Sequence, residues 1–180
     1  MNIYKEDELH FSFPKSLIWQ ELDEKGATLP EGLKLVDLVI ERENDILLVE
    51  IKDPSCSTIP AEHRPVLDKY LLSGNLLKHE LTPKARDSYT FLHLMELADK
   101  PLKYIILLGL DAYELELNPA LLLTFKDKLV GCVLCETKTP WKRLYIADYI
   151  ILSLETWNKT FADWPVTRIA PAAANEGAPA

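Results

Sequence analysis

The sequence predicts an α/β fold with a mixed central β-sheet flanked by helices. Runs rich in Val, Ile and Leu, each of strand length, alternate along the 180 residues with longer segments of helical spacing. Two of these runs are joined by a short turn-like connection, so they pair as an antiparallel hairpin. The later runs are separated by helical segments long enough to serve as parallel crossovers. These observations disfavour an all-α or an all-β fold.

The chain is expected to begin with a helix that leads into the hairpin. Residues 13–25 are expected to form this helix, because Pro14 suits a first turn and Gly26 is a stop signal. The hairpin pairs residues 35–41 with residues 46–52, since both runs are apolar and turn-forming residues lie between them.

Helices and strands continue to alternate in the rest of the chain. They are expected as a proline-rich connection over 53–65, helices over 66–77 and 82–99, a buried strand over 103–110, a helix over 118–129 and a strand over 144–154. Thr82 and Asn118 are good N-cap residues, and each precedes a proline that suits the first helical turn. We expect one domain over residues 1–169 and a disordered Ala/Pro-rich tail over 170–180.

Composition narrows the class of protein. The formal net charge of −8 excludes a polybasic nucleic-acid coat. Residues 1–53 hold 6 Lys and Arg against 13 Asp and Glu, so the acidity is concentrated near the N-terminus. No apolar run reaches the roughly 20 residues that cross a bilayer, and the acidic N-terminus does not resemble a signal peptide. We therefore expect a cytoplasmic protein that does not contact membranes.

The three cysteines do not form a disulfide framework. Cys132 and Cys135 have the C-x-x-C spacing of zinc and redox sites, but the sequence lacks the second ligand pair that a zinc site needs. The alternative, which we favour, is that both are small buried hydrophobic residues.

The residues that indicate chemistry are Asp37, Glu50 and Lys52 in the hairpin. Side chains alternate along a strand, so Glu50 and Lys52 share a face. With an even-numbered loop Asp37 lies on that face too, opposite either Glu50 or Lys52 depending on the turn, with opposed Cβ atoms about 5 Å apart. A divalent cation relieves the repulsion between such carboxylates, and the Ile51 carbonyl is available as a further ligand. Lys52 then suits either activation of a water or neutralisation of a phosphate, which indicates phosphodiester hydrolysis.

The alternative for these charges is the solvated face of an amphipathic hairpin. That alternative predicts a polar face, whereas Val39 and Leu48 share the face of the charges and the opposite face is also apolar. Glu21 adds a further acid, because helical spacing sets it on the apolar side of the expected first helix. An ion pair with Lys25 is an equal alternative for Glu21.

These residues resemble the motif of the PD-(D/E)XK nuclease superfamily, whose core is restriction-endonuclease-like or Holliday-junction-resolvase-like. Asp37 matches the aspartate of that motif, while Glu50 and Lys52 match its E-x-K. Glu21 is the best match for the acid that the family carries on its first helix. The resemblance covers roughly residues 13–110.

The resemblance implies a restriction-endonuclease-like sandwich and a metal-dependent nuclease. Asp37, Glu50 and the Ile51 carbonyl would bind Mg²⁺, with Mn²⁺ as a possible substitute. Lys52 and Glu21 would complete the catalytic set, and hydrolysis would leave a 5′-phosphate on a nucleic acid, with DNA favoured.

Two features depart from the family pattern. Val36 stands where the motif usually has a proline. The family also has a strand before the aspartate strand, and residues 26–34 leave little room for it after the expected helix. Either that strand is vestigial or residues 9–13 supply an edge strand.

Two further groups of residues, which could contact a substrate or a partner, each allow two interpretations. Basic and aromatic residues that suit either phosphate contacts or a solvated surface are Lys78, His79, Lys84, Arg86, Lys138, Trp141, Lys142 and Arg143. Trp157, Phe161 and Trp164 form either a docking or homodimer surface or a cover for the sheet edge. The alternative to a nuclease is therefore a catalytically inactive nuclease-fold module that binds a protein partner or nucleic acid.

Overall fold

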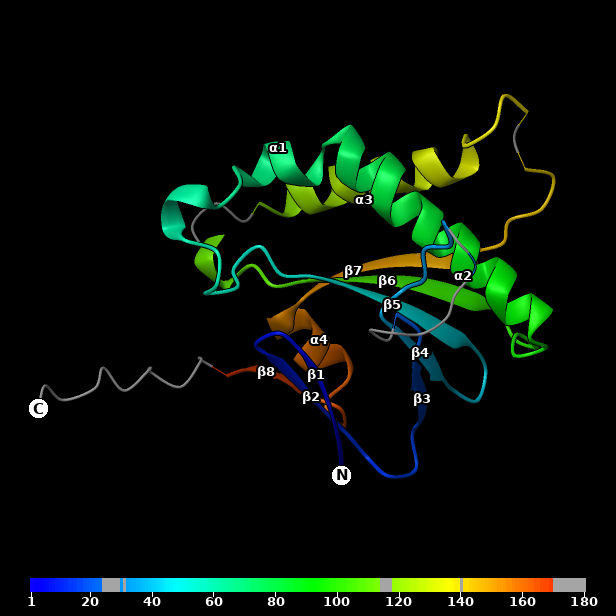
Figure 1. The fold of residues 1–180 in the computed structure, drawn as a ribbon, viewed down its shortest axis with the longest axis horizontal. Coiled ribbons are helices and arrows are strands. Elements are labelled where there is room, and N and C mark those ends of the chain that lie inside the picture. Colours follow the sequence, from blue (N-terminus) through cyan, green and yellow to red (C-terminus); the bar gives the residue numbers. More distant parts are fainter. Residues whose placement is uncertain (24–29, 31, 114–117, 140, 170–180) are drawn as a thin grey trace, which may run out of the picture.

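The computed structural model describes residues 1–23, 30, 32–113, 118–139 and 141–169. It is an α/β structure in which a five-stranded mixed sheet lies between a layer of helices and a small three-stranded sheet with one helix (Figure 1). The predicted α/β class with a mixed central sheet is confirmed. The division into one domain over 1–169 and a tail stays a prediction, and residues 170–180 lie outside the described residues.

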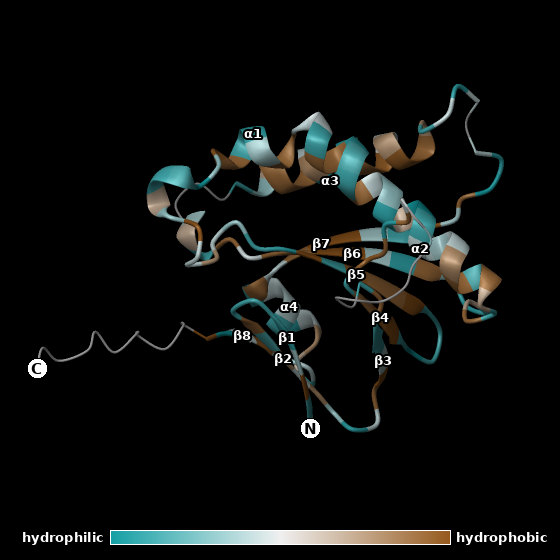
Figure 2. Ribbon diagram, viewed as in Figure 1, coloured by the Kyte–Doolittle hydropathy of each residue, from teal (hydrophilic) through white to brown (hydrophobic). Residues whose placement is uncertain are grey.

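The central sheet has its most apolar strands in the middle. Its strands, in spatial order, are β3 (Ile18–Glu21), β4 (Leu38–Glu41), β5 (Ile46–Lys52), β6 (Leu102–Leu108) and β7 (Asp148–Ser153). β3, β4 and β5 pair antiparallel, whereas β5, β6 and β7 pair parallel. Figure 2 shows the apolar colour along β4 and β5, which fits strands covered on both faces.

Helices from the middle of the chain cover one face of this sheet (Figure 1). They are α1 (Leu67–Leu71), the π-helical segment η2 (Asn75–Leu81), α2 (Thr82–Leu94) and α3 (Pro119–Leu134), with the 3₁₀ turns η1 (Ala61–His63) and η3 (Asp111–Tyr113) in the connections. Leu48, Tyr104 and Ile106 of the sheet are fully buried against them. The predicted start of α3 is confirmed, because the Asn118 Oδ1 accepts a hydrogen bond of 2.9 Å from the Ala120 amide.

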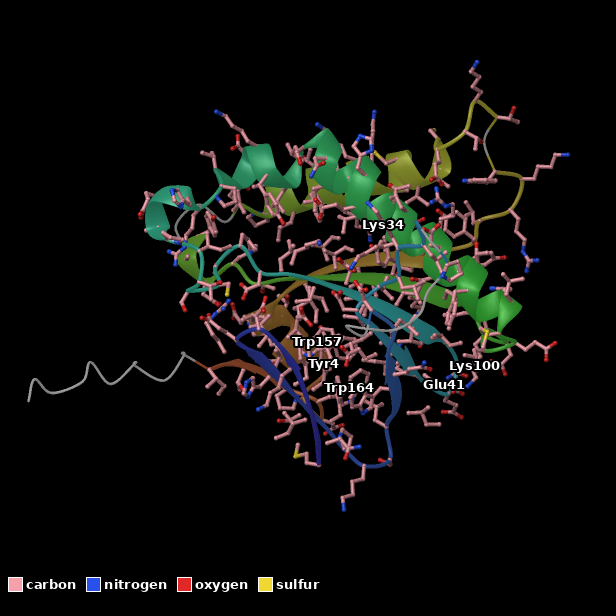
Figure 3. The ribbon with its side chains drawn as sticks, viewed as in Figure 1. Tyr4, Lys34, Glu41, Lys100, Trp157 and Trp164 are labelled. Atoms are coloured by element: carbon pink, nitrogen blue, oxygen red, sulfur yellow. The ribbon has the colours of Figure 1, made fainter. Side chains whose placement is uncertain are left out.

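A second, aromatic layer covers the other face. It consists of the antiparallel strands β1 (Asn2–Glu6), β2 (Leu9–Phe13) and β8 (Val166–Arg168) with helix α4 (Leu154–Thr160). Tyr4, Trp157 and Trp164 lie in this layer in Figure 3. Trp157 is fully buried, with its ring centroid 5.5 Å from that of Phe11. Trp157 therefore packs against the sheet and is not part of an exposed docking surface, while a homodimer stays a prediction.

The helix predicted over residues 13–25 is wrong. Its described part contains a turn, in which the Leu17 amide donates to the Pro14 carbonyl at 3.0 Å, followed by the edge strand β3. Over so few residues, helical and strand spacing of apolar residues are hard to separate, and pairing with β4 decides the outcome. β3 also supplies the strand that lacked room before Asp37, whereas residues 9–13 belong to the smaller sheet.

α2 begins at Thr82, as predicted, but Thr82 does not act as its N-cap, because η2 runs directly into α2 and Thr82 has helical backbone angles. Pro83 cannot donate to the His79 carbonyl four residues earlier, and the Lys34 ammonium bonds that carbonyl at 2.7 Å instead. The Thr82 hydroxyl donates to the Leu77 carbonyl at 2.7 Å. These contacts, together with the wider π-helical turn, accommodate a proline inside a continuous helix.

The ends of other elements differ from their predicted positions. β7 begins only at Asp148 and ends at Ser153, where Ser153 and Thr156 form a capping box that starts α4. α3 continues to Leu134, five residues beyond its predicted end. Within the described residues, no helix is both long and apolar enough to cross a membrane.

Helix α2 is tied to the chain that enters β4. The Ser88 hydroxyl, fully buried, accepts a hydrogen bond of 2.9 Å from the Val36 amide. Asp87 accepts a bond of 3.0 Å from the Lys34 amide. These two contacts fix the backbone directly before Asp37, and so they connect the helical layer to the position of that side chain.

Replacing Ser88 with alanine is expected to lower the free energy of unfolding by about 1–3 kcal/mol, because the buried Val36 amide loses its acceptor. Urea denaturation measures this change. The matched control is Thr90→Ala on the same helix, where the exposed hydroxyl bonds only the Arg86 carbonyl and the expected change is within about 0.5 kcal/mol. Equal effects of the two substitutions would contradict the anchoring role of Ser88.

Candidate functional site

The structure brings Asp37, Glu50 and Lys52 together on the helical side of the sheet. Leu38 pairs with Val49, so the register continues to the pairing of Asp37 with Glu50, one of the two alternatives that the sequence allowed. Alternation along β5 then turns Glu50 and Lys52 to the same face. The Ile51 amide donates to Asp37 Oδ2 at 2.6 Å and holds this carboxylate beside β5.

Two lysines neutralise these carboxylates. The Lys84 Nζ of α2 lies 2.9 Å from Glu50 Oε2 and 3.2 Å from Asp37 Oδ1, so it bridges them. The Lys52 Nζ lies 3.1 Å from Glu50 Oε1 and 3.1 Å from the Glu80 Oε2 of η2. Lys84 thus belongs to the cluster itself rather than to an external phosphate-binding surface.

Exposure increases from the bottom of the cluster to its rim. The Glu50 side chain is 0% exposed, while those of Asp37 and Lys52 are 13% and 19% exposed. Glu80 and Asp23 are 35% and 51% exposed, and Asp23 Oδ2 lies 3.4 Å from the Lys84 Nζ. The cluster is therefore open to solvent on the side of Glu80 and Asp23.

Burial dominates the electrostatics at the bottom of the cluster. It raises the pKa of Glu50 to about 7, and the Asp37 charge adds to this while the Lys84 and Lys52 ammonium groups oppose it. Burial by itself lowers the pKa of each lysine, but the neighbouring carboxylates more than offset it, so the pKa of Lys52 and that of Lys84 lie above the ordinary value. Both lysines are ammonium ions at neutral pH.

The Glu50 carboxylate has capacity for another ligand. Both of its oxygens are buried, and among the described residues each has one lysine ammonium as its close polar partner. Two carboxylates directed at one point are the hard oxygen ligands that Mg²⁺ prefers. Asp37 and Glu50 therefore fit a divalent cation, and the Ile51 carbonyl stays a predicted ligand.

The formal charge of the cluster supports the same interpretation. With every group ionised, four carboxylates face two ammonium groups, which leaves a formal charge of −2. The members are Asp23, Asp37, Glu50, Glu80, Lys52 and Lys84. One divalent cation would balance this charge.

A second group of potential metal ligands lies just beyond the C-terminal end of β5. Within the described residues, Glu8, Asp53 and Cys56 form the one group of three acidic, thiol or imidazole ligands whose atoms lie within 4.8 Å of one another. The Arg168 guanidinium already neutralises it, with contacts of 2.8 Å to both Asp53 oxygens and 3.1 Å to Glu8. Arg168 also bonds Asp111 at 2.6 Å. This group therefore acts as a clasp between β8, the β1–β2 turn and the end of β5.

Glu21 does not join the cluster as predicted. It is the last residue of β3 and pairs with Leu38, so its side chain points to the aromatic layer, opposite Asp37. Asp23, two residues later, contacts Lys84 instead. The prediction that Glu21 is a helix acid of the site is thus wrong. The residue lies on a strand, and its side chain points to the other face of the sheet.

The other candidate residues have separate surroundings. Arg86 forms ion pairs with Asp87 and Glu136 on the helical layer, so it is already neutralised. Cys132 is half-buried and Cys135 is exposed, which contradicts the prediction that both are buried hydrophobic residues.

Sequence reasoning missed Glu80, and it considered Lys84 only for phosphate contacts or as part of a solvated surface. Their signal was present, because residues four apart on one helix share a face. The predicted break between the helices at 77 and 82 separated the two residues. A continuous helix would have directed both toward the hairpin.

Comparison of the chain with protein-family models, with curated proteins and with solved structures gives no match. Any inference about the function of this protein therefore rests on the sheet topology and on the geometry of the Asp37–Glu50 cluster.

Glu50 is expected to make stability depend on pH. Between pH 4.5 and about 7 the folded state retains a proton on Glu50 that the unfolded chain releases, so the stabilisation from this group falls as pH rises. Glu50→Gln removes this dependence. Relative to wild type, the variant should gain up to about 3 kcal/mol in unfolding free energy from pH 5 to pH 7.5.

Urea denaturation at the two pH values, with a chelator to remove divalent cations, measures this difference. Parallel pH profiles for wild type and Glu50→Gln would show that the carboxyl group is ionised throughout and would contradict the effect of burial.

Proposed function

We propose that this protein is a metal-dependent phosphodiesterase, an endonuclease or exonuclease of restriction-endonuclease-like fold that acts on nucleic acid, with DNA as the favoured substrate. The observation that carries the proposal is the convergence of the Asp37 and Glu50 carboxylates on one point beside the Lys52 ammonium. Paired acids with an adjacent cation are suited to phosphodiester hydrolysis.

The order of elements supports the proposal. An edge strand, the strand after Asp37 and the strand with Glu50 and Lys52 form an antiparallel sheet, and a helical crossover leads to the parallel strand β6. This is the order that the resemblance to the PD-(D/E)XK superfamily implies. β3 pairs with β4 in the position that the family gives to the strand before the aspartate strand. The helix acid of that family has no equivalent in Glu21.

The residues of this chain divide the chemistry between them. Asp37 and Glu50 would hold Mg²⁺ or Mn²⁺, and the ion would supply water activation and charge neutralisation when bound. The Ile51 amide and the packing around β5 keep the two carboxylates in place, which limits the positions a cation can take. Lys52 stays an ammonium because its pKa is raised, so it stabilises negative charge on a phosphate rather than accepting a proton.

A second function class has one observation in its favour. Lys84 and Lys52 already neutralise Asp37 and Glu50 within the chain, which suits a structural ion-pair cluster in a catalytically inactive module that binds a protein partner or nucleic acid. Calorimetry separates the two classes, because only the nuclease requires divalent-metal binding that depends on Asp37 and Glu50.

Cleavage assays test the proposed function directly. Plasmid, linear, branched and single-stranded DNA, and RNA, are incubated with the protein and Mg²⁺ or Mn²⁺. Metal-dependent cleavage is expected, and Lys52→Ala should reduce the rate about 10²-fold or more because charge stabilisation at the phosphate is lost.

Lys69→Ala is the matched control, since Lys69 is an exposed lysine of α1. Its rate should equal that of wild type. Cleavage that survives Lys52→Ala unchanged would refute the mechanism, and a folded wild-type protein that cleaves none of these substrates would leave the inactive module as the better account.

A further inference from the structure

We propose that Lys84 is a built-in counter-ion that occupies the cation position between Asp37 and Glu50 and must leave when a divalent cation binds. This inference rests on the proposed function, because it concerns the same pair of carboxylates. It adds a regulatory element to the site: affinity for metal is set by competition with a lysine of the same chain.

The geometry of the Lys84 ammonium carries the first step. Its Nζ lies 3.2 Å from Asp37 Oδ1 and 2.9 Å from Glu50 Oε2, between the two carboxylates that would ligate the cation. Two positive charges at this point would repel each other strongly in a site where Glu50 is fully buried. A cation on both carboxylates and Lys84 in its present position therefore exclude each other.

Charge balance gives the same result. With Lys84 between them, Asp37 and Glu50 have their two negative charges offset by the Lys84 and Lys52 ammonium groups. Removal of Lys84 would leave the two carboxylates with only Lys52 as a close cation. Their mutual repulsion would then favour a divalent cation more strongly than in the wild-type protein.

Asp23 offers the displaced ammonium a second position. Its Oδ2 already lies 3.4 Å from the Lys84 Nζ, and its side chain is 51% exposed at the rim of the cluster. The flexible lysine side chain can therefore move toward solvent without losing its last carboxylate partner. In that position the ammonium lies at the open side of the site, where an anionic substrate would approach.

Isothermal titration calorimetry with Mn²⁺ and with Mg²⁺ tests the inference without any cleavage readout. Lys84→Met is expected to bind the metal about ten- to hundredfold more tightly than wild type, because no ammonium has to be displaced. Lys78→Met is the matched control, since Lys78 is an exposed lysine of η2 that forms no ion pair with the four carboxylates of the described cluster. Its affinity should equal that of wild type.

A second variant keeps the test valid if Lys84→Met does not fold. Asp23→Asn leaves the bottom of the cluster intact and removes the second position of the ammonium, so it should weaken metal binding several-fold. Circular dichroism and thermal unfolding establish that each variant is folded. In the double variant with Lys84→Met, the effect of Asp23→Asn should shrink, because no ammonium remains to be accepted.

The outcomes separate the inference from the proposed function. Equal metal affinity in wild type and Lys84→Met, with binding lost in Asp37→Asn, would overturn the counter-ion role and leave the metal site intact. Binding of metal by neither protein would overturn both. Tighter binding by Lys84→Met supports the inference, even where no cleavage of nucleic acid is found.

Discussion

The buried carboxylate of Glu50 is the constraint on which the rest of this structure depends. A fully buried acid on a central strand costs free energy unless cations lie beside it, and here they come from two elements. β5 supplies Lys52, and α2 supplies Lys84. Helix α2 must therefore lie where Lys84 reaches Glu50. Asp87 and Ser88 hold it there, because they accept hydrogen bonds from the amides of Lys34 and Val36 in the chain that enters β4.

The layers on the two faces of the central sheet are held by different interactions. The aromatic layer of β1, β2, β8 and α4 is held by close packing and by the Arg168 clasp, in which the guanidinium is bonded to three carboxylates. The helical face contains the open cluster, whose lysines reach its acids through flexible side chains. The proposed divalent-metal site is the Asp37–Glu50 cluster rather than the Glu8–Asp53–Cys56 group, in which Arg168 bonds both carboxylates.

Local rules predicted the hairpin and its three charged residues, because alternation and a short turn determine which side chains share a face. Asn118 likewise marked the start of α3 from local capping alone. The rules failed where distant contacts decide. Residues 18–21 form a strand because β4 pairs with them, and Pro83 is tolerated inside a helix because Lys34 bonds the carbonyl that it leaves free. The predicted break before Thr82 divided the continuous helix that carries Glu80 and Lys84, and so their shared face toward the hairpin was not predicted.

The central claim is that Asp37 and Glu50 form a divalent-cation site from which Lys84 is displaced. Anomalous diffraction from crystals soaked in Mn²⁺ tests it most directly. The account predicts one strong peak in coordination distance of both carboxylates, with the Lys84 ammonium moved toward Asp23. Absence of that peak with Lys84 still bridging Asp37 and Glu50, or a peak found only among Glu8, Asp53 and Cys56, would contradict it.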